Sequence, residues 1–148
     1  MSNTYCALNV HCVFCTKDRR PLIVDEFEQS LWKYLGGIAR QNGMKALSIG
    51  GVPDHVLISL PTSISVAKAV QLMKGGSSKW IHDNFPEQRA FAWQRGYGAF
   101  SVSTSLIQEN VAYIRNQKEH HRRKTFQEEY VSFLRKNWVD YDERYLWK

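Results

Sequence analysis

The chain has 148 residues, of which 43% are hydrophobic and 23% are charged, values typical of a folded globular protein rather than a disordered one. This length predicts a single domain over residues 1–148, because it is too short for two separate cores. No apolar run approaches the roughly 18 residues of a membrane-spanning helix, and the first residues lack the pattern of a signal peptide. We therefore expect a cytoplasmic protein without membrane attachment.

The formal net charge of +6 favours a polyanionic partner, and nucleic acid is the first candidate. The three cysteines, Cys6, Cys12 and Cys15, lie in one apolar segment, and their odd number argues against a disulfide framework. Cys12 and Cys15 would point to opposite faces of a strand, so zinc binding by this pair is disfavoured.

The first half of the chain predicts a strand, a helix and two further strands. Aromatic and β-branched residues over 5–16 indicate a strand that ends in a charged turn. A helix follows from Asp25, expected as its N-cap, to Asn42-Gly43, with apolar residues at helical spacing. Residues 44–52 and 55–60 predict two adjacent strands joined by a tight turn at Pro53-Asp54.

The second half predicts a helix capped by Ser65 and weakened at Gly75-Gly76, then a strand over 91–103 broken at Gly96 and Gly98. Two capping boxes, beginning at Ser105 and Thr125, predict two final helices. The order β-α-β-β-α-β-α-α predicts an α+β fold, a ferredoxin-like or RRM-like antiparallel sheet. Its helices would pack on one face, and a C-terminal helical extension would carry Tyr113.

Tyr113 and Gln117 lie four residues apart on the first of these final helices, so both side chains could reach one phosphate. A tyrosine can attack phosphorus and form a covalent phosphotyrosine. A glutamine amide oxygen is an acceptable ligand for Mg²⁺ or Mn²⁺. A tyrosine on an amphipathic helix is also ordinary core or boundary packing, and the spacing alone does not separate these alternatives.

The segment from Lys118 to Lys124, KEHHRRK, is strongly basic. Lys118, Arg122 and Arg123 are candidate contacts to a phosphate backbone, although a solvated loop between two helices would have the same composition. His120 and His121 could bind a metal, but side chains adjacent in sequence rarely converge on one ion.

A second basic group, Lys17, Arg19 and Arg20, follows the first strand. These side chains could clamp phosphates or could simply solvate a turn. His55 lies in a short apolar strand, where a lone histidine is usually structural.

Four segments, HCVFCTKDRRPLI, GGVPDHVLISLP, GYGAFSVS and YIRNQKEHH, resemble in this order the single-tyrosine HUH transposases of bacterial insertion sequences, the IS200-like family. The resemblance implies a homodimer that binds single-stranded DNA with hairpin ends, cuts one strand and holds the 5′ end on a tyrosine. It also implies that the tyrosine helix can be exchanged between subunits. In this chain Tyr113 matches the nucleophile, while Gln117 and His55 match ligands of a Mg²⁺ or Mn²⁺ ion.

The chain departs from the family pattern around His55. The family has two histidines separated by one hydrophobic residue, whereas this chain continues from His55 with Val56, Leu57 and Ile58. The segment is also about two residues shorter than the family pattern. Because side chains of a strand alternate with a period of two, a loss of two residues leaves the remaining side chains on the same faces of the sheet. We expect weaker metal binding, and an alternative function follows: a catalytically impaired relative that still binds DNA hairpins.

A third possibility is an RNA-binding module on the sheet. Tyr5, Phe14 and Trp93 are aromatic residues that could stack on unpaired bases. Packing in the core is the competing explanation for the same residues.

Overall fold

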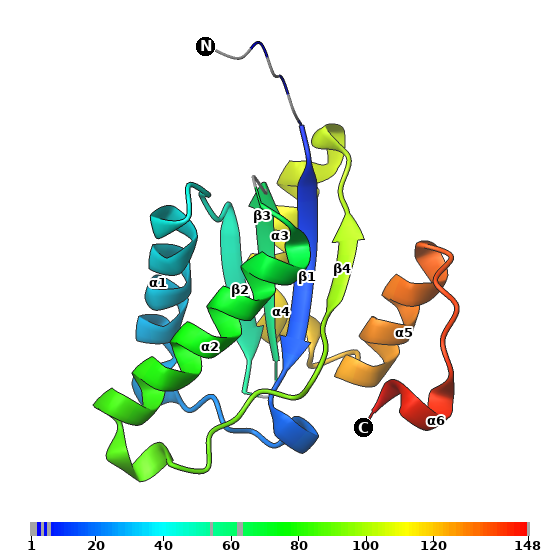
Figure 1. Ribbon diagram of the computed structural model, residues 1–148. Coiled ribbons are helices and arrows are strands. Elements are labelled where there is room, and N and C mark those ends of the chain that lie inside the picture. The colour runs from blue at the N-terminus through cyan, green and yellow to red at the C-terminus, as the bar shows by residue number, and fades with distance from the viewer. Residues whose placement is uncertain (1–2, 4, 6, 54, 62–63, 148) are drawn as a thin grey trace.

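A four-stranded antiparallel sheet forms the centre of the protein in a computed structural model that describes residues 3, 5, 7–53, 55–61 and 64–147 (Figure 1). Every neighbouring pair of strands is antiparallel, and the strand order is β2-β3-β1-β4. The strands are β1 (Asn9–Cys15), β2 (Ser48–Val52), β3 (His55–Pro61) and β4 (Gly98–Ser101).

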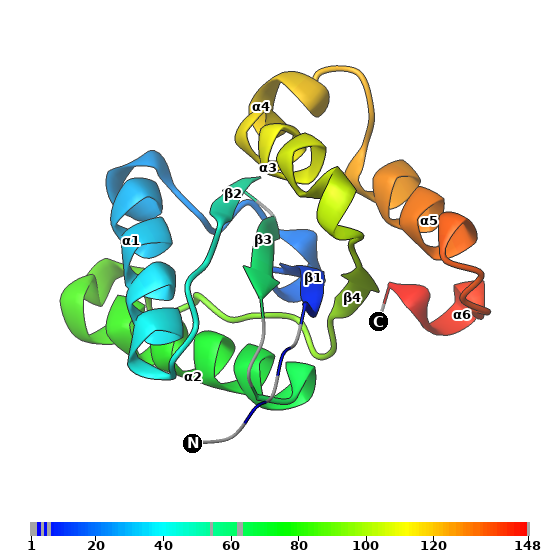
Figure 2. The same ribbon diagram turned by 90° about the horizontal axis from the view of Figure 1, so that it is seen from above.

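Helices cover both faces of this sheet. α1 and α2 lie on one face, α3 and α4 lie across the other, and α5 and α6 continue beyond β4 (Figures 1 and 2). The α+β class is confirmed, α1 and α2 lie on one face as expected, and the C-terminal extension places α3 and α4 on the other face (Figure 2). The helices are α1 (Asp25–Gln41), α2 (Val66–Asn84), α3 (Ile107–Arg115), α4 (Gln117–His120), α5 (Phe126–Lys136) and α6 (Glu143–Leu146). None of the described helices is both long and apolar enough to cross a membrane.

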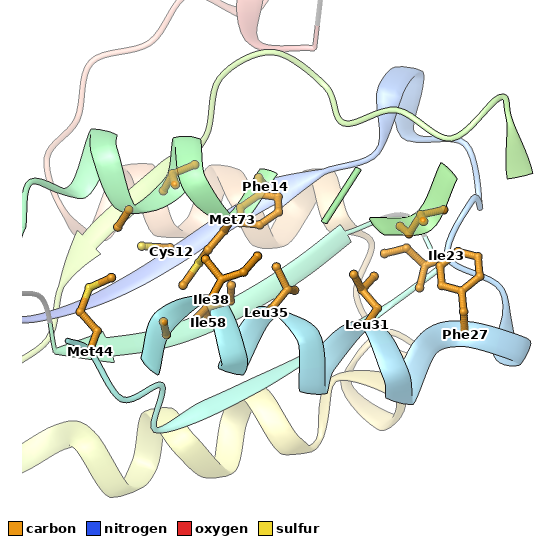
Figure 3. Packing of buried hydrophobic residues seen from close by; sticks show 14 of the residues in the cluster. Cys12, Phe14, Ile23, Phe27, Leu31, Leu35, Ile38, Met44, Ile58 and Met73 are labelled. Atoms are coloured by element: carbon orange, nitrogen blue, oxygen red, sulfur yellow. The ribbon is translucent and has the colours of Figure 1, made fainter. Parts of the chain in front are cut away.

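Alternation along β1 divides the core into two clusters. Cys12 and Phe14 belong to the larger cluster between the sheet and helices α1 and α2 (Figure 3). Val13 belongs to a smaller cluster with Phe100 of β4, Ile114 of α3 and residues of α5. Because successive side chains of a strand point to opposite faces, β1 joins both clusters. Burial raises the pKa of the Cys12 thiol to about 12, which disfavours the thiolate that a metal would need.

Two of the four expected helix caps are present. Ser65 accepts a hydrogen bond from Lys68 N, and Thr125 accepts one from Glu128 N. Asp25, which was expected to be the N-cap of α1, is instead the first residue of that helix. The N-cap of α1 is Val24, whose side chain cannot accept a hydrogen bond. The cap expected at Ser105 is also absent, as described below.

Glycines mark two close approaches. α2 continues through Gly75 and Gly76, contrary to the expected weakening, and a Cβ on Gly76 would lie 2.9 Å from Ile38 Cδ1 of α1. A Cβ on Gly98 would lie 2.8 Å from the Tyr130 hydroxyl, which confirms a close approach at this glycine. β4 itself is shorter than expected, and upstream of it an isolated bridge pairs Trp93 with Thr16.

The aromatic residues considered for RNA binding are separated by burial. Phe14 is only 2% exposed, and its ring meets the partly buried Trp93 edge to face, with centroids 4.8 Å apart. Tyr5 is 93% exposed. Phe14 and Trp93 therefore pack in the core between sheet and helices, and the prediction that they stack on bases is wrong.

Candidate active site around Tyr113

α3 reaches the sheet because β2 has a glycine at the contact. A Cβ on Gly50 would lie 2.6 Å from the backbone oxygen of Ile114, a distance that no side chain tolerates. Ile114 is fully buried, and Tyr113 beside it is half-buried. The absence of a side chain at Gly50 thus determines how deeply the tyrosine helix sits.

The expected continuous helix over 105–117 is broken in two places. A 3-10 turn, Thr104–Leu106, precedes α3, and no side chain caps α3. α3 ends at Arg115, Asn116 leaves helical geometry with φ −96° and ψ 20°, and Gln117 begins α4. Despite this break, Gln117 Nε2 lies 3.4 Å from the backbone oxygen of Tyr113, so the two residues remain neighbours.

The Tyr113 hydroxyl donates a hydrogen bond to Oε2 of Glu129, a residue of α5 that is 1% exposed. The tyrosine ring lies between His120, with centroids 4.8 Å apart, and Phe133, at 5.9 Å. Burial, followed by the hydrogen bond to Glu129, raises the pKa of Tyr113 above its usual value. The phenol is therefore neutral at physiological pH.

Two histidines approach the same carboxylate oxygen of Glu129: His120 is the last residue of α4, and His121 is the C-cap that follows it. Glu129 Oε2 lies 3.2 Å from His121 Nε2 and 3.4 Å from His120 Nε2. His121 Nε2 also lies 3.0 Å from Gln117 Oε1; because its neighbours on both sides are acceptors, this nitrogen carries the hydrogen. Burial lowers the pKa of His120. His121 thus links Gln117 to the partner of the tyrosine.

His11 enters the site from β1. Its Nδ1 donates to Asn110 Oδ1 of α3 at 2.8 Å, and its ring centroid is 6.3 Å from that of Tyr113. The side chain is 3% exposed, and its Nε2 has no hydrogen-bond partner among the described residues. Burial lowers the pKa of His11, and the hydrogen bond to Asn110 only partly offsets this effect.

The depressed pKa of His11 predicts a loss of stability on acidification. The unfolded chain takes up a proton near pH 6.5 and the folded chain only at lower pH, so acid favours unfolding below about pH 6.5. Thermal melts at pH 7 and pH 5 should therefore show a smaller decrease in Tm for His11→Gln than for the parent. An equal decrease in both proteins would contradict this role of His11.

His55 is the first residue of β3, paired in the sheet with Cys15 of β1 and Val52 of β2. Its side chain lies outside the described part of the structure. Asp54 also lies outside the described residues. The hairpin expected around Pro53 is confirmed, because β2 and β3 pair directly across this turn.

The fit to a divalent cation is partial. Gln117 contributes one buried oxygen, but that oxygen is already hydrogen-bonded to His121. Across the described ranges, no group of three or more His, Cys, Asp or Glu side chains is arranged to hold a metal ion.

The basic residues differ in how their charges are balanced. Lys118 Nζ lies 3.1 Å from Oε1 of Glu28, a buried residue of α1, and Arg122 pairs with Glu119 at 3.1 Å. Arg19 lies over the Trp147 ring, 5.2 Å from its centroid. Lys17, Arg20 and Arg123 are exposed. The segment expected as a loop over 118–124 is helical through His120.

Glu129 and His11 belong to this site, although neither residue was predicted from the sequence. Glu129 nevertheless has a local signal, because it lies between Phe126, Tyr130 and Phe133 on the apolar face of its helix. A carboxylate in such a stripe is unusual, since burying a charge is costly unless it is paired. His11 has no comparable signal in the sequence.

Residues 4–117 match the family model described as "Transposase IS200 like". The ISDra2 transposase TnpA of Deinococcus radiodurans is 27% identical over 119 residues, covering 76% of this chain and 85% of that protein. The transposase for insertion sequence element IS200 of Salmonella typhimurium is 29% identical, covering 74% of this chain and 76% of the relative.

Two solved structures are similar. A crystal structure of a transposase from Deinococcus radiodurans R1 has a TM-score of 0.61 and 26% identity, covering 79% of this chain and 96% of that one. A REP-associated tyrosine transposase bound to a REP hairpin has a TM-score of 0.59 and 14% identity, covering 82% and 74% of the two chains, and supports the fold alone. Since the family model covers most of its length, the chain belongs to the IS200-like transposase family.

Proposed function

We propose that this protein is a single-stranded DNA transposase that cuts and rejoins DNA through a 5′-phosphotyrosine on Tyr113. The observation that carries the proposal is the Tyr113 hydroxyl held by a buried carboxylate, with Gln117 one helical turn away. Membership of a transposase family supports strand transfer over the alternative, a hairpin-binding protein that no longer cuts.

The proposed chemistry needs a hydroxyl nucleophile and no external energy source. Attack by Tyr113 Oη on a phosphodiester releases a 3′ hydroxyl and keeps the phosphodiester energy in the protein–DNA bond. The same bond is then attacked by another 3′ end, and the strand is rejoined. Packing of Tyr113 against Phe133 and His120 restricts its ring to few orientations, which favours one direction of attack.

The proposed substrate is single-stranded DNA with hairpin ends. A protein of the same fold was solved with a REP hairpin, and the net charge of +6 favours a polyanion. The strand order β2-β3-β1-β4, with α1 and α2 on one face, supports the ferredoxin-like assignment. We include in the proposal a homodimer in which the tyrosine helix is exchanged between subunits.

A divalent cation, Mg²⁺ or Mn²⁺, is also part of the proposal, with Gln117 and His55 as its ligands on this chain. When bound, such an ion polarises a phosphate oxygen. Gln117 would have to exchange its hydrogen bond with His121 for the ion.

Arg123 should contribute more to hairpin binding than Lys118. Lys118 is already paired with Glu28, whereas Arg123 is exposed and forms no ion pair with any described residue. Arg123→Ala should weaken hairpin binding and reduce the slope of log K against log salt by about 1. Lys118→Ala, the matched control, should change that slope less. The opposite order of the two slopes would contradict the account.

Covalent capture of DNA tests the proposed function. Purified protein is incubated with Mn²⁺ and a hairpin oligonucleotide that carries a single-stranded flank, labelled in separate reactions at the 5′ or the 3′ end. A 5′-phosphotyrosine retains only the fragment with the 3′ label on denaturing gels, and a chelator should suppress it. Hairpin binding without any adduct would support the impaired relative instead.

A further inference from the structure

Glu129 contacts the reacting atom of the proposed mechanism, although it lies beyond the part of the chain that matches the family model, residues 4–117. It comes from α5, a helix that begins at the Thr125 cap and lies beyond β4 (Figure 2). The side chain is 1% exposed, and its Oε2 accepts the hydrogen bond from the Tyr113 hydroxyl.

Burying a carboxylate is unfavourable unless other groups compensate its charge. The polar groups nearest to Glu129 Oε2 are the Tyr113 hydroxyl, which donates a hydrogen bond, His121 Nε2 at 3.2 Å and His120 Nε2 at 3.4 Å. Phe126 and Leu134 of the same helix are also buried, so Glu129 places a carboxylate on the apolar face of α5. That carboxylate is directed at the Tyr113 hydroxyl.

We infer that Glu129 is the proton acceptor for Tyr113, the general base of strand cleavage. This inference rests on the proposed function. As Tyr113 Oη forms its bond to phosphorus, the bond from phosphorus to the 3′ oxygen breaks, and the hydroxyl proton moves to Glu129 Oε2. The 3′ oxygen takes a proton from water. In rejoining, an incoming 3′ hydroxyl attacks phosphorus and loses its proton to water, while the bond from phosphorus to Tyr113 Oη breaks and Glu129 returns its proton to the departing Tyr113 oxygen.

The other titratable groups around Tyr113 are less suited to this role. His121 Nε2 already carries a hydrogen, which it directs at Gln117 Oε1 and Glu129. His120 Nε2 lies 3.4 Å from Glu129 Oε2. The His120 ring packs edge to face with the Tyr113 ring and does not bond to the Tyr113 hydroxyl. His11 donates from Nδ1 to Asn110, and its Nε2 has no hydrogen-bond partner among the described residues, so it does not hold the Tyr113 hydroxyl. Glu129 is the acceptor that holds the hydroxyl hydrogen itself.

Glu129→Gln tests the inference, because it keeps the shape and an acceptor oxygen while removing the basic carboxylate. The rate of covalent adduct formation under single-turnover conditions should fall by about 10²–10⁴-fold, the usual contribution of a general base. Hairpin affinity should stay within about twofold of the parent, a margin that is small beside that loss. Glu128→Gln is the matched control, because Glu128 is exposed on the same helix and a glutamine still completes the capping box.

A second measurement separates a proton acceptor from a structural side chain. In Glu129→Ala, added formate should restore part of the cleavage rate, whereas chloride at the same ionic strength should not. Cleavage by Glu129→Gln at or above the parent rate, or a slow Glu129→Ala that ignores formate, would overturn the inference. Absence of any adduct in the parent protein would instead refute the proposed function.

Discussion

Replacing Tyr113 by phenylalanine should abolish the covalent protein–DNA adduct, because the variant lacks the oxygen that attacks phosphorus. The ring can keep its contacts with Phe133, His120 and His11, so α3 should remain in place. Hairpin binding should persist, since the phosphate contacts come from other side chains. Denaturing gels measure the adduct, and gel shifts on the same samples measure binding.

Tyr97→Phe is the matched control for this variant. Tyr97 is 41% exposed and directly precedes β4. Its replacement should leave adduct formation intact. An adduct that survives in Tyr113→Phe but disappears in Tyr97→Phe would move the nucleophile to the other residue.

Gly50→Ala should produce the largest loss of stability among single-methyl changes in the site. The added Cβ would lie 2.6 Å from the backbone oxygen of Ile114, and backbone cannot move aside as the end of a side chain can. We expect a decrease of about 1–3 kcal/mol in the free energy of unfolding, the usual range for overpacking. α3 must also shift from β2, so adduct formation per folded molecule should fall. Chemical denaturation and the adduct assay measure the two effects.

Gly75→Ala provides the control for Gly50→Ala. A Cβ at Gly75 meets no atom within 4 Å, and the residue lies inside α2. Alanine should therefore stabilise the protein by about 0.5–1 kcal/mol through its helix propensity. A Gly50→Ala variant as stable as the parent or more stable would refute the close approach of α3 to β2.

Much of the fold follows from local sequence signals. Apolar periodicity predicted the order of the main strands and helices, and hydroxyl side chains at Ser65 and Thr125 marked two helix starts. The cap predicted at Ser105 is absent because Ser105 lies inside the 3-10 turn Thr104–Leu106 and α3 starts only after Leu106. Local signals also could not predict the second covered face, because the docking of α5 depends on tertiary contacts of Val13 and Phe100.

Only the part of the candidate site that lies within one helical turn could be predicted from the sequence. Tyr113 and Gln117 are close in sequence, and helical spacing was enough to pair them. Glu129 reaches Tyr113 across a helix break and a turn, and His11 meets Asn110 across a separation of 99 residues. No periodic pattern in the sequence links either pair of residues. Both contacts form only when α3 packs against the sheet and α5 packs against α3.

Identification of the DNA-linked residue tests the central claim most directly. The adduct formed with Mn²⁺ is digested with nuclease and trypsin, and the modified peptide is fragmented in a mass spectrometer. Trypsin should release residues 96–115, which contain both Tyr97 and Tyr113, so the fragment ions must locate the phosphate. The proposed mechanism predicts the phosphate on Tyr113, and a phosphate on Tyr97 or on any other residue would contradict it.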